Sequence, residues 1–365
     1  MQLGIIGLAR SGKTTIFNAV TRGTAQVGAY SASAQPNVGV VHVPDDRVDK
    51  LAALYHPKKT TYATIEYVDF PAAGESFGKG EGPAGKFIND LGRMDALIHV
   101  VRAFEDETVP HPEVTIDAQR DIATMDLELA FADMGQIERR LGRIEAEMRS
   151  MKAGEREQLT RTSELLTRIK GQLEDDVPVR AQELSDEDWR LLEGTKFLTA
   201  APLLVVVNIG DGDLPRRGAI EAEYRARYEG KARDVAVFCG KFEMELNELS
   251  DEEAAEFRES AGVTESGMAN AIRVSYELLG LISFLTAGPD ECRAWTVAAG
   301  STAPVAAGKI HSDLQRGFIR AEVIRCEDLL AAGSEAEAKK RGLLRTEGKN
   351  YIVQDGDVLH VLFNV

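Results

Sequence analysis

The sequence predicts an α/β protein with a helical insertion and a separate C-terminal part. Three observations lead to this fold class. Short apolar, strand-like runs alternate with helical stretches in much of the chain, which is typical of a mostly parallel sheet with helices on both faces. Residues 121–199 instead repeat apolar side chains every three or four positions. From about Gly280 onwards, short β-rich runs are separated by turn residues.

Length and composition indicate a multidomain cytoplasmic protein. The chain has 365 residues, enough for two or three domains. Its net charge of −16 argues against a protein that coats DNA or an anionic membrane through its overall field. We expect no membrane contact, because no apolar run approaches the roughly 18 residues of a membrane span, and the N-terminus lacks a signal-peptide pattern. The three cysteines form no CxxC pair, which favours a reducing compartment.

Six strand-like runs are expected in the α/β part of the chain. They are apolar, short and bounded by turn residues or helical stretches. The runs are residues 2–7, 38–43, 64–70, 96–101, 203–208 and 235–239. Because the last two runs follow the insertion, the α/β domain is expected to comprise residues 1–120 and 200–279.

Residues 121–199 are expected to form two long amphipathic helices. Strongly charged residues separate the apolar positions, and Gly154 breaks the pattern. The apolar positions are Leu127, Phe131, Met134, Ile137, Leu141, Ile144, Met148, Leu159, Leu166, Ile169 and Leu173. This spacing predicts an antiparallel coiled-coil hairpin.

The remaining residues, 280–365, are expected to form a small α+β domain. Their β-rich runs include GFIRAEVIRC and NYIVQDGDVLHVLFNV, with Asp355-Gly356 as a turn. About 80 residues is a plausible size for one module.

Residues 7–14 read GLARSGKT and satisfy the phosphate-loop pattern G-x-x-x-x-G-K-[ST]. Gly7 and Gly12 allow the tight turn in which backbone amides face phosphate oxygens. The following helix directs its N-terminal dipole at the same anion. The amides expected to bind phosphate belong to Arg10, Ser11, Gly12, Lys13 and Thr14. The pattern predicts a nucleotide site.

Side chains in and after this loop are expected to act on the phosphates and on a metal ion. Lys13 is expected to reach the β- and γ-phosphates as a catalytic residue, and the Thr14 hydroxyl to bind Mg²⁺. Thr15 could add a contact to the α-phosphate. Asp69 ends a strand in YVDFPA, where a carboxylate would hold Mg²⁺ through a water molecule.

Two later loops are candidates for contacts with the base. The strand LLVVVN ends in Asn208-Ile209-Gly210-Asp211, which resembles the guanine-reading pattern N-K-x-D with Ile in place of Lys. Cys239 and Gly240 follow the next strand. We expect Asn208, Asp211, Cys239 and Gly240 to lie at the base.

With these motifs in view, the chain resembles the YchF/Obg-like ATPase family of translation-factor-related P-loop NTPases over nearly its whole length. The most specific stretches are PNVGVVHVPDDRVDKLA, DALIHVVRAFED, DIATMDLELAFADM and RAWTVAAGSTAPVAAGKIHSDLQRGFIRAEVI. The resemblance implies a G domain, a coiled-coil insertion and a TGS domain of ubiquitin-like fold. It also implies ATP or GTP hydrolysis with Mg²⁺, and binding to the ribosome or RNA through the TGS domain and the coiled-coil arm.

The chain departs from the family pattern at the two switch segments. Ser33 stands where the family has Thr, and its hydroxyl is expected to bind Mg²⁺. Ala72 replaces the switch II glycine and Ala73 follows it, so no glutamine orients the attacking water there. His111 aligns with a family histidine and is our second candidate catalytic residue, with a polar surface histidine as the alternative.

The choice of base stays open between two arguments. Asp211 can accept the N1 and N2 protons of guanine and favours GTP. The missing lysine at Ile209 removes a stem that would cover the purine and favours a relaxed or adenine-preferring site. We expect slow hydrolysis of ATP, with GTP also accepted. The alternatives are a GTP-preferring GTPase and a nucleotide-binding interaction module with little or no hydrolysis.

Overall fold

The computed structural model describes residues 1–23, 25, 36–71, 83–151, 156–263 and 266–364. Ser33, Ala72 and Ala73 lie outside these residues. The chain divides into two compact units, residues 1–39 with 66–271 and residues 40–65 with 272–365. The domain boundaries expected above stay a prediction. In the structure, residues 40–65 group with the C-terminal part. No helix in the described ranges is long and apolar enough to cross a membrane.

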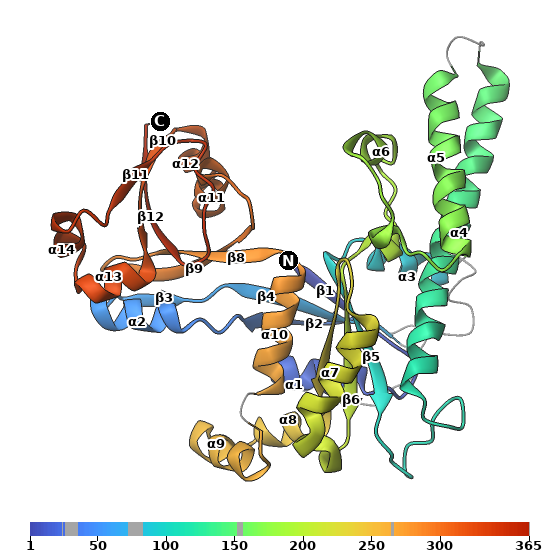
Figure 1. Cartoon of the computed structure of the whole chain (residues 1–365), viewed down its shortest axis with the longest axis horizontal. Coiled ribbons are helices and arrows are strands. Elements are labelled where there is room, and N and C mark those ends of the chain that lie inside the picture. Colours follow the sequence, from blue (N-terminus) through green and yellow to red (C-terminus); the bar gives the residue numbers. More distant parts are fainter. Residues whose placement is uncertain (24, 26–35, 72–82, 152–155, 264–265, 365) are drawn as a thin grey trace. The chain divides into compact units, whose positions relative to one another are not determined.

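All six strand-like runs of the α/β part form one sheet (Figure 1). Its order is β2-β4-β1-β5-β6-β7. Strand β1 pairs in parallel with β4 and β5, β5 with β6, and β6 with β7. The strands are β1 (Gln2–Ile6), β2 (Asn37–His42), β4 (Thr64–Asp69), β5 (Ala96–Ala103), β6 (Leu203–Ile209) and β7 (Arg233–Phe238). The predicted α/β fold class is therefore confirmed.

Helices accompany these strands in the chain order that the sequence predicts. Strand β6 is buried over its whole length, as a central strand covered on both faces must be. Its carboxyl end lies beside that of β5 and β7, so the loops after these strands meet at one edge. The helices are α1 (Lys13–Thr21), α3 (Pro83–Leu91), α7 (Arg217–Tyr228), α8 (Gly240–Leu246), α9 (Asp251–Ser260) and α10 (Gly267–Leu278).

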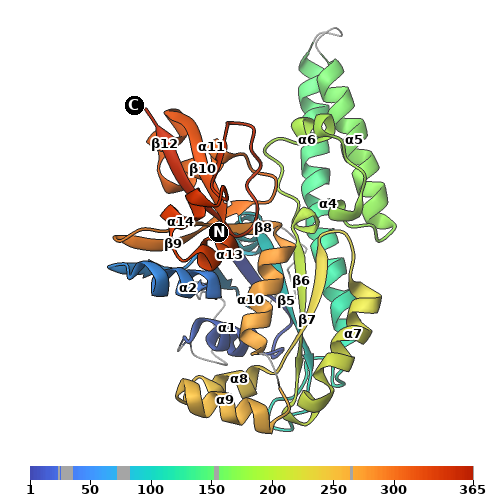
Figure 2. The same ribbon diagram turned by 60° about the vertical axis from the view of Figure 1, so that its left-hand side comes forward.

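Helix α4 (Ala118–Ser150) takes part in two hydrophobic cores. Its first half contributes Ile122, Met125 and Leu129 to the core of the sheet. Its second half packs Ile137 and Ile144 with residues of α5 (Glu157–Glu174), and the two helices run side by side in both views (Figures 1 and 2).

The predicted apolar stripe is wrong in the first half of α4. Leu127 and Phe131 are 45% and 51% exposed instead of packing in the hairpin. The physical reason is that this half of the helix faces the sheet, whereas the predicted stripe assumes that one partner helix covers the same face along the whole of α4. The buried face there is the one that carries Ile122, Met125 and Leu129.

The chain returns from the hairpin to the sheet through a buried anchor at Asp133. Its carboxylate accepts hydrogen bonds from the backbone N–H of Leu198 at 2.7 Å and of Thr199 at 2.8 Å, and from the Thr199 hydroxyl at 2.7 Å. Burial raises the pKa of Asp133 to about 6, although these hydrogen bonds oppose the rise. The segment holds the short helices η3 (Val179–Ala181), α6 (Asp186–Leu191) and η4 (Leu198–Ala200). The anchor leads directly into β6.

The second unit has its own six-stranded sheet, in the order β11-β10-β12-β8-β9-β3. The short strand β3 (Lys59–Thr61) comes from the earlier segment, with α2 (Asp46–Tyr55), and pairs in parallel with β9. The strands that follow are β8 (Leu281–Thr286), β9 (Glu291–Ala298), β10 (Phe318–Arg325), β11 (Arg345–Glu347) and β12 (Asp357–Phe363). The helices are α11 (Ala303–Ile310), α12 (Ser312–Arg316), α13 (Cys326–Ala332) and α14 (Glu335–Lys340). The C-terminal part therefore mixes strands and helices as predicted.

His99 on β5 makes folding stability depend on pH. The side chain is fully buried, and neither ring nitrogen has a hydrogen-bond partner in the described part of the chain. Burial, assisted by the charges of Arg233 and Lys13, lowers its pKa from 6.5 to about 3. Between these values the unfolded chain binds a proton that the folded chain does not, so stability falls as the pH drops through this window.

We expect His99→Leu to lose less stability on acidification than the unchanged protein. When the pH falls from about 7.5 to about 5, the free energy of unfolding should drop by about 2 kcal/mol more in the unchanged protein than in His99→Leu. Urea denaturation of both proteins at both pH values measures this difference, in which other titrating groups such as Asp133 cancel. Equal losses in the two proteins would contradict the assignment.

Candidate functional site

The phosphate loop connects β1 to α1 and depends on two glycines. Gly7 has φ 152°, and a Cβ atom there would lie 2.4 Å from the carbonyl oxygen of Val100. Gly12 has φ 92°, and its Cβ would lie 2.3 Å from Nδ2 of Asn208. Both the backbone angles and the lack of space exclude a side chain. Gly12 is the N-cap of α1, so the free amides of the first helical turn point into the loop.

Lys13 is buried beneath this loop. Its Nζ donates hydrogen bonds to the carbonyl oxygens of Gly7 and Leu8, both at 3.0 Å. Burial lowers the pKa of Lys13 from 10.5 to about 8, although the nearby Asp69 charge opposes this. An anion in the loop would favour the charged form of this amine. The lysine is therefore placed where an added phosphate can bind it.

Thr14 and Asp69 form a pair that fits a magnesium ion. The Thr14 hydroxyl donates to Oδ2 of Asp69 at 2.9 Å, and the Asn37 amide donates to the same oxygen at 3.3 Å. The other oxygen, Oδ1, is buried and has no hydrogen-bond partner among the described residues. Burial raises the pKa of Asp69, against the effects of Thr14, Asn37 and Lys13. An unsatisfied oxygen beside a hydroxyl suits a hard cation that prefers oxygen ligands.

Asn208 connects the phosphate loop to the loop after β7. Its Nδ2 donates to the carbonyl oxygen of Ser11 at 3.1 Å, and its Oδ1 accepts from the backbone N–H of Gly240 at 3.0 Å. A Cβ atom on Gly240 would approach Thr15 to 3.2 Å. The structure thus brings the predicted residues Ser11, Thr15, Asn208 and Gly240 together. The Asn208 amide is occupied by backbone partners, and its contact with a base stays a prediction.

Asp211 lies at the same edge and is held by two side chains. Lys241 Nζ donates to its Oδ2 at 3.1 Å, and the Cys239 thiol donates to its Oδ1 at 3.2 Å. Burial raises the pKa of Cys239 to about 12, so the thiol stays protonated and acts as a donor. Ile209 is only 3% exposed and packs in the core of the sheet. It therefore does not supply the stem that a lysine would lay over a purine.

His111 contacts helix α4 rather than the phosphate loop. Its Nε2 lies 2.9 Å from Oδ2 of Asp121, and its Nδ1 accepts the backbone N–H of Glu113 at 3.1 Å. Because Nδ1 is an acceptor, Nε2 carries the proton that it donates to Asp121. Arg120 holds the other Asp121 oxygen at 2.8 Å. Both ring nitrogens are therefore occupied, and the catalytic role of His111 stays a prediction.

The sequence does not predict several residues that the structure adds to this site. Asn37 follows Pro36 in the quoted stretch PNVGVV, which was the available signal. Arg102 donates to the carbonyl oxygens of Val109 at 2.7 Å and Phe104 at 3.1 Å, and so shapes the loop that carries His111. A lone arginine at a strand end gave no signal for this role. From the sequence, Asp121 is only the first residue of the expected helical hairpin.

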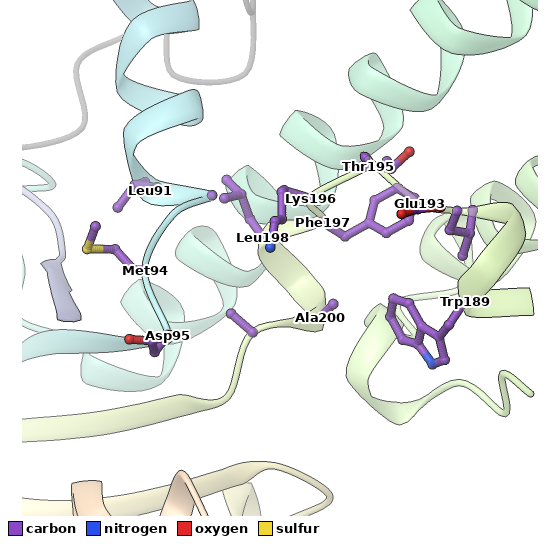
Figure 3. A pocket seen from close by; sticks show the side chains of 14 residues that line it. Leu91, Met94, Asp95, Trp189, Glu193, Thr195, Lys196, Phe197, Leu198 and Ala200 are labelled. Carbon is purple, nitrogen blue, oxygen red and sulfur yellow. The ribbon is translucent and has the colours of Figure 1, made fainter. Parts of the chain in front are cut away.

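A separate hollow of about 330 Å³ lies between α3 and the segment that returns from the hairpin (Figure 3). Its lining includes Leu91, Met94, Trp189 and Phe197. None of the residues predicted for the site lines it. The candidate site is therefore the phosphate loop with its surrounding loops.

The chain is similar to known proteins over its full length. It is 42% identical over 365 residues to "Ribosome-binding ATPase YchF" of Bacillus subtilis (strain 168), covering 99% of each chain. It is 37% identical over 364 residues to the protein of the same name from Escherichia coli O157:H7, again covering 99% of each chain.

Two further comparisons agree. The family model YchF-GTPase_C, described as "Protein of unknown function (DUF933)", matches residues 281–364. The solved "Structure of the Schizosaccharomyces pombe YchF GTPase" superposes with a TM-score of 0.82 at 28% identity, covering 99% of this chain and 97% of that chain.

The lowered pKa of Lys13 predicts that phosphate binding takes up protons. At about pH 8 half of the free protein should have a neutral lysine, and bound phosphate should restore its charge. We expect uptake of about half a proton per ADP bound at that pH, and affinity that falls from about pH 8 to about pH 9.5. Calorimetry in two buffers of different ionisation enthalpy measures the uptake.

Cys239→Ala serves as the matched control, because its thiol is another buried titratable group near the loop and should stay protonated throughout. The variant should take up as many protons as the unchanged protein. Binding without proton uptake, at an affinity independent of pH in this range, would rule out the lysine assignment.

Proposed function

Because the chain belongs to the YchF family of P-loop nucleotide hydrolases, we propose that it is a slow, Mg²⁺-dependent ATPase that also accepts GTP. We further propose that its nucleotide state controls binding to the ribosome or RNA. The relatives in Bacillus subtilis and Escherichia coli O157:H7 are named ribosome-binding ATPases. We also propose a cytoplasmic location, because a protein that binds ribosomes would meet them there.

The observation that supports this proposal most is the geometry of the phosphate loop. Gly12 caps α1 in the left-handed conformation, and Lys13 lies buried beneath the loop carbonyls. The N-terminus of α1, the loop amides and the ammonium group of Lys13 therefore all belong to one short turn, which favours an anion there. This arrangement suits the β- and γ-phosphates of a nucleoside triphosphate.

Catalysis in this proposal consists of positioning and charge stabilisation, without a covalent intermediate. Water attacks the γ-phosphorus, and the bond from that phosphorus to the β–γ bridging oxygen breaks. The diphosphate leaves with the electron pair, and a proton of the water passes to solvent. Lys13 and the loop amides stabilise the charge on the transferred group. His111 could orient the water only after it leaves Asp121.

Magnesium would be held by Thr14 directly and by Asp69 through a water molecule, with Ser33 as a further proposed ligand from the undescribed segment. When bound, the ion neutralises charge on the β- and γ-phosphates. The buried, unsatisfied Oδ1 of Asp69 supports this assignment. The Thr14 hydroxyl, which now donates to Asp69, would turn to present its oxygen to the ion.

The C-terminal part and the hairpin are the proposed surfaces for the ribosome or RNA. Several cationic side chains of the second unit are exposed, among them Arg316 and Lys340, whose side chains are each 76% exposed. They could contact phosphates. Both are also paired with carboxylates, so an RNA backbone would have to compete with these partners.

The rival function is a nucleotide-holding interaction module with little hydrolysis. Ser33, Ala72 and Ala73 are the reason to consider it. Ser33 and Ala72 depart from the switch pattern of the family, and Ala73 stands where Ras-like enzymes carry a water-orienting glutamine that the family also lacks. A multiple-turnover phosphate-release assay with ATP separates the two functions. We expect release above that of Lys13→Ala, and faster release when ribosomes are added. Release equal to that of Lys13→Ala with and without ribosomes would reject the enzyme.

The proposed base preference can be tested by titrating fluorescent ATP and GTP analogues side by side. We expect ATP to bind at least as tightly as GTP. GTP binding that is tenfold tighter, a gap of about 1.4 kcal/mol, would overturn the preference. Asp211→Ala should weaken GTP more than ATP, because only guanine offers N–H donors on two neighbouring atoms, N1 and N2, to this carboxylate. Lys241→Ala is the matched control, since it removes one of the two partners of Asp211 and leaves the acceptor in place.

A further inference from the structure

Arg10 is an unusual side chain within the phosphate loop. It is exposed, and its backbone has φ 63° in the left-handed region, which non-glycine residues rarely adopt. It stands two residues before Gly12 in GLARSGKT. The sequence assigned only its backbone amide to phosphate binding. Its guanidinium therefore has no role in the function proposed above.

Among the described residues, the guanidinium of Arg10 has a single hydrogen bond. Its Nη1 donates to the carbonyl oxygen of Pro110 at 2.8 Å, in the exposed loop just before His111. This is its one hydrogen bond within the described residues, and no carboxylate among them forms an ion pair with it. The charge of Arg10 also acts on Arg102, whose pKa is lowered first by burial and further by this neighbour, against the effect of Asp106.

A cation without an anionic partner, next to an anion-binding loop, is placed to receive an anion. Arginine stays charged at every physiological pH, and its planar fork of donors matches phosphate oxygens. Charge on the three equatorial oxygens of the γ-phosphoryl group is what a P-loop enzyme must stabilise. An arginine supplied by the chain itself can do this.

We infer that the Arg10 side chain is a catalytic residue that leaves Pro110 and binds the γ-phosphoryl group during hydrolysis. This inference rests on the proposed NTPase function and adds a residue to it. In the step written above, the guanidinium stabilises the charge on the transferred phosphoryl group and on the bridging oxygen that leaves with the diphosphate. When Arg10 leaves Pro110, the hydrogen bond between the phosphate loop and the loop that carries His111 is lost.

The test compares Arg10→Ala and Arg10→Lys with the unchanged protein. Because Arg10 is exposed, both variants should fold. We expect kcat to fall at least roughly a hundredfold in Arg10→Ala, with the Kd for ADP within about threefold. Guanidinium ion at a low, non-denaturing concentration should restore part of the turnover in Arg10→Ala. Arg10→Lys should stay slow, because an ammonium group lacks the fork.

A measurement without turnover separates this inference from the function itself. The unchanged protein should trap ADP with aluminium fluoride and Mg²⁺, as a mimic of the transferred group, whereas Arg10→Ala should bind ADP and fail to trap it. An unchanged protein that binds ADP but neither turns over nor traps the complex overturns the proposed function and the inference with it. Normal turnover and trapping by Arg10→Ala overturns the inference alone.

Two controls test the alternative that Arg10 only holds the loop with Pro110 in place and does not contact the phosphoryl group. Arg120→Ala loosens the same loop, because Arg120 holds Thr115 and Asp121, yet it is not part of the phosphate loop. If Arg10→Ala and Arg120→Ala lose turnover alike and guanidinium ion rescues neither, the inference is wrong. Arg93→Ala removes an exposed charge just before the start of β5. The loop with Pro110 follows the other end of this strand, so the variant should leave turnover unchanged.

Discussion

The close approach of Gly12 and Asn208 is the constraint on which the site depends. The Asn208 amide occupies the space that a side chain at position 12 would need, and from there it binds both Ser11 and Gly240. One buried side chain therefore fixes the loops that follow β1, β6 and β7 relative to one another. Loss of either hydrogen bond would leave a buried polar group without a partner, which costs about 1–3 kcal/mol. The anion-binding shape of the loop thus depends on a residue nearly 200 positions later in the chain.

Helix α4 connects the phosphate site to the helical insertion. Its first turn holds His111 through Asp121, its first half completes the core of the sheet, and its second half forms the hairpin with α5. Asp133, in the middle of the helix, fastens the chain that leads into β6 and so towards Asn208. One continuous helix therefore joins the loop near the phosphate site to the insertion. A partner that bends or rotates the hairpin would act on an element that also positions His111.

The charges around the phosphate loop are only partly balanced in this structure. Lys13 is buried against carbonyl oxygens, and within the described ranges Arg10 has a single carbonyl partner and one oxygen of Asp69 has no hydrogen-bond partner. The buried ammonium group of Lys13 and the buried, unsatisfied oxygen of Asp69 are unfavourable for a folded protein without ligands. A triphosphate with its magnesium ion would satisfy all three groups at once. These groups are therefore already in position in the free protein, and bound nucleotide would supply the partners that they lack.

The sequence by itself determined the α/β fold class, the six strands and the phosphate loop, because these depend on local signals. Apolar runs fix strands, and the glycines at positions 7 and 12 are required by the turn itself. The buried face of α4 could not be predicted correctly, because Leu127 and Phe131 fit a helical stripe whichever neighbour the helix meets. The Asn37, Arg102 and Asp121 contacts, and the tie between Arg10 and Pro110, join segments far apart in the chain or in irregular loops. Only the tertiary structure decided these, because periodicity and motif spacing carry no information about which distant groups become neighbours.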